Sequence, residues 1–168
     1  MKQKTKNIII CILGVLIVTL LTTLLVKQIK GNQEPNENRR DYNINQEEKD
    51  IYKTKNKINI YFFRGEGCAH CAAEIDFLNS NKKIIDKYAN VFIFETWENP
   101  KNEKLLYEML DQIDEDYSGV PAVFIGKEYI LGFGEDTAQN IMNLITEGKT
   151  KNYIDLYDKV KKERNEKK

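Results

Sequence analysis

Apolar residues gather first in one long run near the start of the chain. Residues 8–26 carry no charged side chain and are mostly Ile, Leu and Val. As an α-helix, this run of 19 residues would be roughly 28 Å long, close to the hydrocarbon thickness of a bilayer. Lys2, Lys4 and Lys6 precede it, as in a secretory signal. We therefore predict an N-terminal signal anchor at residues 1–30, with its transmembrane helix at 8–26.

Two other kinds of signal fit this segment less well. A cleaved signal peptide would place small residues after the apolar run, whereas residues 27–30 read Lys-Gln-Ile-Lys. A lipoprotein signal would place its cysteine after the apolar core, and Cys11 lies near the start of that core. Positive charges on both sides of the run leave its orientation open under the positive-inside rule. Because a short basic tail before such a helix usually stays in the cytoplasm, we expect the rest of the chain on the outer side of the cell membrane.

The segment that follows the anchor is polar. Residues 31–56 contain Gly31, Pro35, many Asn residues and dense charges, without a sustained apolar period. This composition predicts a linker that ends in a short helix near residues 47–55.

The globular part begins at residue 57, where a mostly apolar segment follows the linker. Residues 58–63 predict a buried strand, which Gly65 and Gly67 end. The further elements that we expect are a helix from Cys68 through Ile85, a strand at 91–94, a helix from Pro100 through Ile113, strands at 122–125 and 129–131 joined by a turn at 126–127, and a helix at 137–145. This order predicts an α/β domain at residues 57–148, in which helices flank a mixed four-stranded sheet. Apolar residues at helical spacing then predict a docked helix in the C-terminal tail, residues 149–168.

Composition and charge exclude several classes of function. The chain has 26 Lys and Arg residues against 26 Asp and Glu residues, so nothing in its charge indicates a nucleic-acid partner. The frequent use of Lys, Asn and Ile resembles the composition of proteins from an AT-rich bacterium. The chain has three cysteines, and a small secreted disulfide scaffold would need more of them.

The two cysteines that lie close together form a C-x-x-C motif, Cys68-Ala69-His70-Cys71, between a predicted strand and a predicted helix. At a helix N-terminus, the Cys68 sulfur would face unpaired backbone N–H groups and the positive end of the helix dipole, which favour the thiolate. A protonated His70 beside it would favour the thiolate further. Cys71, one turn into the helix, could then resolve a mixed disulfide by attacking Cys68.

Other roles for this cysteine pair fit the sequence less well. A structural disulfide across so short a loop would restrict the unfolded chain by only about 2 kcal/mol. Zinc would need a second pair of ligands, and haem attachment would need a histidine directly after Cys71, where the chain has Ala72. A Cu(I) site made of the two thiols stays open as an alternative. We expect no cofactor and no other metal.

A second motif lies before the third predicted strand. Gly119-Val120-Pro121 precedes the strand at 122–125, at a place where a sheet tolerates proline. The strand–C-x-x-C–helix unit, this Val-Pro pair and the order of elements together resemble the thioredoxin superfamily over about residues 57–148. The resemblance implies a three-layer thioredoxin-like fold, a cis peptide bond at Pro121 packed against the dithiol, and Val120 as a backbone contact for an extended substrate.

The chain departs from the family pattern near the dithiol. Its central Ala-His pair is closer to the Pro-His of periplasmic disulfide oxidants than to the Gly-Pro of thioredoxin. Phe62 stands where thioredoxin buries an Asp that handles the proton of the resolving cysteine, and Gly67 stands where it has Trp. The proton acceptor of Cys71 is therefore open, with Glu66 and Glu95 as candidates beside their interpretation as solvated loop charges.

Two further residues have a functional and a plain interpretation. Arg64 could support the Cys68 thiolate or be a surface charge. Trp97 could line the substrate groove or be the edge of the core.

Together these observations predict a membrane-anchored thiol–disulfide oxidoreductase. Cys68 would attack, Cys71 would resolve, His70 would tune the thiolate, and Val120 with Pro121 would hold the substrate chain. The expected partners are protein thiols and disulfides, the membrane through residues 8–26 and a membrane redox partner. The alternative is a thioredoxin-like binding module, such as a Cu(I) chaperone or an assembly adapter, without redox turnover.

Overall fold

The computed structural model describes residues 41–117, 119–148 and 153–167. Residues 41–168 fall in one compact unit. The predicted signal anchor at 1–30, with its helix at 8–26, lies outside the described residues. Within the described part of the chain, no helix is both long and apolar enough to cross a bilayer.

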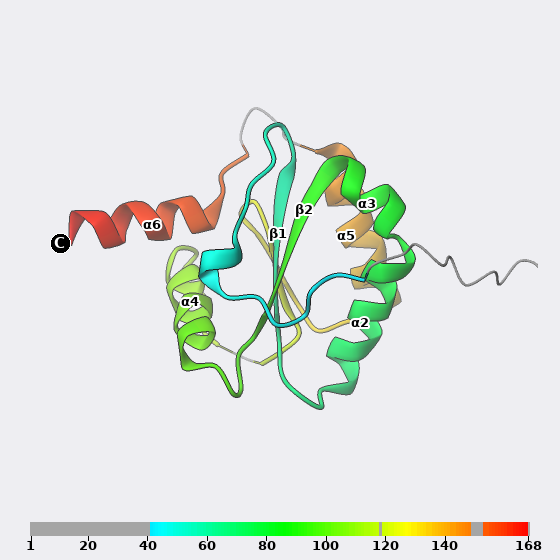
Figure 1. Cartoon of the computed structure of the whole chain (residues 1–168), viewed down its shortest axis with the longest axis horizontal. Helices are drawn as coiled ribbons and strands as arrows, with labels where there is room; N and C mark the ends of the chain where they lie inside the picture. The colour runs from blue at the N-terminus through cyan, green and yellow to red at the C-terminus, as the bar shows by residue number, and fades with distance from the viewer. Residues whose placement is uncertain (1–40, 118, 149–152, 168) are drawn as a thin grey trace, which may run out of the picture. The chain divides into compact units, whose positions relative to one another are not determined.

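A mixed sheet of four strands forms the centre of the domain, as the sequence predicted (Figure 1). The strands lie in the order β2-β1-β3-β4 and are β1 (Ile58–Arg64), β2 (Ala89–Glu95), β3 (Ala122–Ile125) and β4 (Glu128–Leu131). Strand β1 runs parallel to β2 and antiparallel to β3, and β3 and β4 form an antiparallel hairpin. All seven residues of β1 are buried, including Asn59 and Arg64. The strand is mostly apolar because it is central and covered on both faces.

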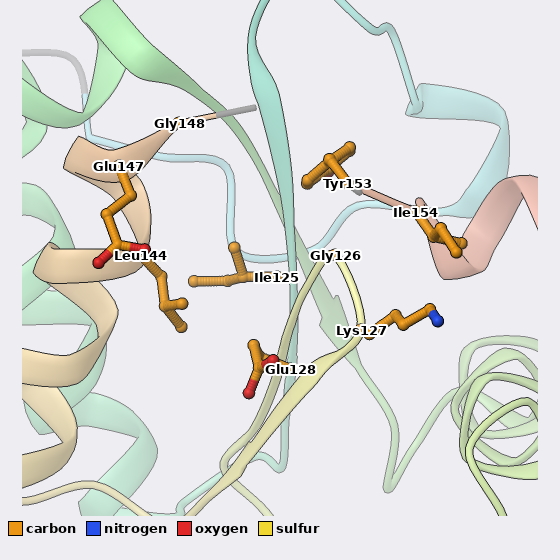
Figure 2. A pocket seen from close by; sticks show the side chains of 9 residues that line it. All are labelled: Ile125, Gly126, Lys127, Glu128, Leu144, Glu147, Gly148, Tyr153 and Ile154. Carbon is orange, nitrogen blue, oxygen red and sulfur yellow. The ribbon is translucent and has the colours of Figure 1, made fainter. Parts of the chain in front are cut away.

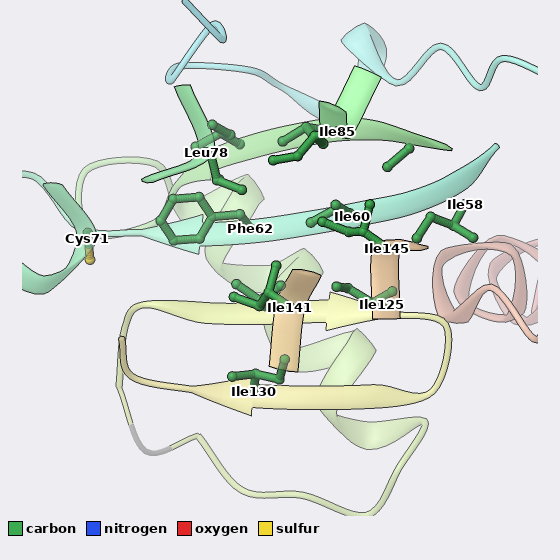
Figure 3. Packing of buried hydrophobic residues seen from close by; sticks show 14 residues of the cluster. Ile58, Ile60, Phe62, Cys71, Leu78, Ile85, Ile125, Ile130, Ile141 and Ile145 are labelled. Atoms are coloured by element: carbon green, nitrogen blue, oxygen red, sulfur yellow. The ribbon is translucent and has the colours of Figure 1, made fainter. Parts of the chain in front are cut away.

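Helices cover the two faces of the sheet as separate layers (Figure 1). On one face lie α2 (Ala69–Ser80), α3 (Lys82–Tyr88) and α5 (Glu135–Glu147), and on the other lie α4 (Pro100–Asp111) and α6 (Leu156–Glu166). Alternate residues of β1 serve the two layers, since Phe62 belongs to the core under α2 and Phe63 to the core under α4. Figure 3 shows the first of these cores, with Leu78 of α2 facing Phe62.

The sequence predicted one helix from Cys68 through Ile85. This prediction is wrong in one respect, because the structure has two helices there, α2 and α3. Asn81 has φ −101° and ψ 6° and ends α2. Its side-chain amide donates to the carbonyl oxygen of Phe77 at 2.9 Å, and its backbone N–H donates to the same oxygen at 3.1 Å. After this break α3 turns Ile85 into the core and leaves Ile84 44% exposed.

A segment before the domain, residues 41–56, lies along the open edge of β2; we refer to it as the strap. Gln46 donates its backbone N–H to the Ile93 carbonyl at 3.0 Å and accepts the Ile93 N–H on its side-chain oxygen at 2.7 Å. Asn102 of α4 donates to the Gln46 carbonyl at 3.0 Å. The sequence predicted a linker at residues 31–56; the part of it that is described contacts the sheet edge and contains one short 3-10 helix, η1 (Glu48–Asp50).

The predicted C-terminal helix is present as α6 and packs beside α4. Leu156, Tyr157 and Val160 are its buried residues. Arg164 pairs with Glu48 of the strap at 2.6 Å and also with Glu108 of α4. One guanidinium therefore joins α6 to two other parts of the domain.

Candidate redox site

Cys68 and Cys71 form a disulfide at the start of α2, with their Cα atoms 5.2 Å apart. Cys68 is the N-cap of the helix, and its sulfur accepts the backbone N–H of Cys71 at 3.2 Å. Cys71 is only 1% exposed, whereas Cys68 is half-buried. The outer sulfur is thus the one that a substrate can reach, and it lies where the N-terminal N–H groups of a helix favour a negative charge.

The turn that brings Cys68 to this place depends on glycine. Strand β1 ends at Arg64, and the chain then reverses so that the Cys68 N–H donates to the Gly65 carbonyl at 3.3 Å. Gly67 has φ +74°, a conformation that a residue with a side chain rarely adopts. The glycines that end the strand in the sequence therefore also direct the first cysteine to the helix start.

The loop before β3 meets this turn. The Val120–Pro121 peptide bond is cis, as the resemblance implied, and the Val120 carbonyl oxygen lies 3.9 Å from the Cys68 sulfur. Because β3 pairs antiparallel with β1, with Ala122 opposite Phe63, the start of β3 lies beside the end of β1. Residues that are far apart in the sequence, Cys68 and Val120, therefore share one surface.

The sheet has the strand order β2-β1-β3-β4, and its C-x-x-C helix faces a cis-proline. The domain has a thioredoxin-like fold. It is similar in structure to an uncharacterized thioredoxin-like protein from Clostridium perfringens, with 19% identity and a TM-score of 0.41 over 56% of this chain and 72% of that one. It is also similar to glutaredoxin 1 from Francisella tularensis, solved as a complex with cacodylate, with 23% identity and a TM-score of 0.36 over 51% of this chain and 98% of that one. No family model and no curated protein matches the sequence.

His70 lies on the first turn of α2, between the cysteines of the thioredoxin-like domain, and is exposed. Its tuning role stays a prediction. Among the described residues, no group of three or more His, Cys, Asp or Glu side chains is placed to hold a metal ion.

Glu95 joins the loop after β1, which carries the dithiol turn, to the loop after β2. It ends β2, is 7% exposed, and accepts backbone N–H groups from Glu66 at 3.3 Å, Trp97 at 2.8 Å and Glu98 at 2.9 Å. Its carboxylate oxygens are thus engaged with backbone donors. Of the two proton acceptors that the sequence offered, Glu95 holds loops together, and Glu66 pairs with Arg64 at 2.5 Å.

Arg64 is neither a surface charge nor a contact of Cys68 in this structure. The residue is 5% exposed. Its guanidinium binds the Ile44 carbonyl at 3.2 Å and the Glu66 carboxylate at 2.5 Å. It therefore ties the strap to the dithiol turn.

Trp97 lies at the border of the site. Its indole ring rests on Gly65, where an added Cβ would overlap the ring. The side chain is nevertheless 55% exposed. An apolar, solvent-facing ring therefore lies against the turn that carries Cys68, and its role in lining a substrate groove stays a prediction.

Glu74 is the residue that the sequence reasoning missed. It lies on α2, is 0% exposed, and neither carboxylate oxygen has a hydrogen-bond partner among the described residues. Burial raises the pKa of this carboxyl to about 8. The signal was available in the helical spacing, because Cys71, Glu74 and Leu78 are the buried residues of α2 and recur at the intervals of one helix face.

A hollow of about 310 Å³ lies at the turn of the β3–β4 hairpin (Figure 2). It is lined by Ile125, Gly126, Lys127, Glu128, Leu144, Glu147, Gly148, Tyr153 and Ile154. No cysteine or histidine is among these lining residues, so the redox chemistry belongs to the dithiol surface.

Proposed function

We propose that this protein is a thiol–disulfide oxidoreductase that exchanges disulfides with protein substrates through Cys68 and Cys71. One observation carries the proposal. A half-buried Cys68 at a helix N-terminus lies against the backbone that precedes a cis-proline, while its partner Cys71 is buried behind it. This gives one sulfur access to substrate and reserves the other for resolution.

The exchange follows from this geometry. In the reducing direction, the Cys68 thiolate attacks a substrate disulfide, forms a mixed disulfide and releases the first substrate thiolate. Cys71 then attacks the Cys68 sulfur, closes the intramolecular disulfide and releases the second substrate thiolate. The oxidising direction is the reverse, starting from a substrate thiolate that attacks Cys68. Val120 would align the substrate chain with its backbone carbonyl, and His70 would stabilise the Cys68 thiolate.

Serine variants of the cysteines test this function. The assay follows a peptide whose fluorescence is released when its single disulfide is reduced, with dithiothreitol as the electron source. Cys68→Ser should fall to the uncatalysed rate, because no exposed thiolate is left. Cys71→Ser should accumulate a mixed disulfide that is visible by mass spectrometry. Cys11→Ser is the matched control and should keep the parent rate; full activity in Cys68→Ser would refute the proposal.

The direction of electron flow can be measured by titrating the Cys68–Cys71 couple against glutathione. A potential near about −270 mV would assign a reductase, and one near about −120 mV would assign an oxidant. Tight Cu(I) binding without turnover of disulfide substrates would instead favour the binding module.

We also propose that residues 8–26 anchor the chain in a bacterial membrane, with the dithiol on the outer side and a membrane redox partner that recycles it. The uncharged run and its basic lead support this proposal. In intact cells, a membrane-impermeant maleimide should label Cys68 in the Cys71→Ser variant. Labelling that appears only after the cells are lysed would place the domain inside.

A further inference from the structure

Glu74 is a buried acid for which the fold offers no partner. A carboxylate placed in an apolar core without hydrogen bonds is strongly unfavourable, so proteins rarely keep one without a reason. Here both oxygens are inaccessible to solvent and unpaired within the described residues. The residue lies between Cys71 and Leu78 on the buried face of α2, and both of these belong to the core between that helix and the sheet.

The position of Glu74 relative to the buried sulfur is set by the helix. Residues three apart on a helix have Cβ atoms about 5–6 Å from one another, so Glu74 and Cys71 are neighbours on one face. Figure 3 shows Cys71 and Leu78 on the α2 side of the sheet, with Phe62 of β1 in the same core. Because Phe62 of β1 is apolar, the strand supplies no acid at this position. The buried acid is instead Glu74 on α2, about one turn after Cys71.

The other charged groups of this layer are engaged or exposed. Arg64 and Glu95 are buried in the strands, and their side chains are held by Glu66 and by backbone groups. The remaining charged or titratable side chains on α2, α3 and α5 are at least partly exposed, namely His70, Asp76, Lys82, Lys83, Asp86, Lys87, Tyr88, Glu135, Asp136 and Glu147. Burial is accordingly the one cause that raises the pKa of Glu74.

We propose that Glu74 is the proton acceptor and donor for Cys71, an inference that rests on the proposed function. In the resolving step, the Glu74 carboxylate takes the Cys71 proton while the Cys71 sulfur attacks the Cys68 sulfur of the mixed disulfide. The new Cys68–Cys71 bond forms, the bond from Cys68 to the substrate sulfur breaks, and the substrate leaves as a thiolate. In the reverse step, the Glu74 carboxylic acid returns the proton to the departing Cys71 sulfur. The two-electron exchange takes place among the three sulfur atoms, so no further oxidant or reductant is required.

The raised pKa of Glu74 agrees with this role. The disulfide is closed, and burial raises the pKa of Glu74 to about 8, so at neutral pH the carboxyl holds the proton that the resolving step delivers. A group that titrates close to the working pH can both accept and donate a proton, which is the condition for efficient general acid–base catalysis.

The test separates the two steps of oxidation. In the full chain with Cys11→Ser, Cys68 and Cys71 are the thiols that remain. Reduced protein is mixed with Ellman's reagent. Attack by Cys68 releases one coloured thiolate in a phase that depends on reagent concentration, and attack by Cys71 on the mixed disulfide releases the second in a concentration-independent phase. Glu74→Gln should slow the second phase roughly 100-fold near neutral pH and remove its inflection with pH, while the first phase keeps its rate.

Control variants distinguish loss of the carboxyl from loss of structure. Asp76→Asn removes an exposed carboxyl from the same helix and should leave both phases unchanged. Glu74→Asp keeps a carboxyl and should retain a pH-dependent second phase. If Glu74→Gln resolves the mixed disulfide with the parent rate and pH profile, the inference is wrong while the oxidoreductase function stands. If Cys68→Ser retains turnover with a protein disulfide, the function itself fails.

A measurement on the parent chain supports the same test without a variant. The oxidised protein at neutral pH should show the infrared C=O stretching band of a buried protonated carboxyl, and this band should change on reduction. A spectrum without that change would overturn the inference even if Glu74→Gln failed to fold.

Discussion

Replacing Glu74 with glutamine should remove one pH dependence from the stability of the oxidised protein. In the folded chain, burial raises the pKa of this carboxyl from 4.5 to about 8. The unfolded chain, which exposes it to water, keeps the lower value. Between these two values the folded state binds more protons than the unfolded state, so raising the pH favours unfolding.

The size of the effect follows from the two pKa values. The contribution of Glu74 is most favourable below pH 4.5 and is lost as the pH rises to about 8. Relative to its value below pH 4.5, the free energy of unfolding is lower by about 3 kcal/mol at pH 7 and by about 5 kcal/mol above pH 9.

Urea unfolding of the oxidised full chain at a series of pH values between 5 and 9 measures this. The difference in unfolding free energy between the parent and Glu74→Gln should change across the series by a few kcal/mol, in favour of the variant as the pH rises. Asp76→Asn, on the exposed face of the same helix, should give a difference without that trend. A constant difference between the parent and Glu74→Gln would show that Glu74 ionises normally and would refute the reasoning.

Three other substitutions probe the supports of the site and fold. Gly65→Ala should displace the indole of Trp97, the single tryptophan of the chain, so that its fluorescence maximum shifts and the unfolding free energy falls by about 1–3 kcal/mol. Leu106→Ala, at a fully buried position of α4, should cost about 2–5 kcal/mol in urea unfolding. Arg164→Ala should cost about 1 kcal/mol at low salt and less at high salt, whereas Lys162→Ala, at an exposed position, should leave the midpoint unchanged in both.

The sheet was predictable because its strands are short, apolar and bounded by turn residues. Residues 58–63 and 122–125 match β1 and β3 to within one residue, since both strands are buried on the two faces and are mostly apolar. Strand β2 extends beyond its apolar centre to Ala89 and Glu95. Those ends depend on pairing with β1, which a local pattern does not contain.

The helical layer was predicted less well, for a reason seen at Asn81. The apolar residues Ile84 and Ile85 fit the spacing of one continuous helix, whereas in the structure Asn81 leaves the helical conformation and its side chain bonds the Phe77 carbonyl. Propensity alone does not distinguish an asparagine that ends a helix from one that projects into solvent.

The site was predictable where it depends on motifs and not where it depends on packing. The position of Cys68 and Cys71 at a helix start and the approach of Val120 follow from the motifs and the order of elements. The position of Glu74 depends on which face of α2 is buried: Cys71, Glu74 and Leu78 face the core, and an acidic residue in such a face does not mark it as apolar. The role of Glu95 requires knowing that loops after β1 and β2 meet.

The strap has a consequence for how copies of the protein behave toward each other. Strand β2 is at the margin of the sheet, and Gln46 occupies the N–H and C=O groups of Ile93 there. Unsatisfied groups at such a margin invite another chain to extend the sheet. Proteolytic removal of the residues up to Gln46 would expose this template and favour edge-to-edge pairing between trimmed copies.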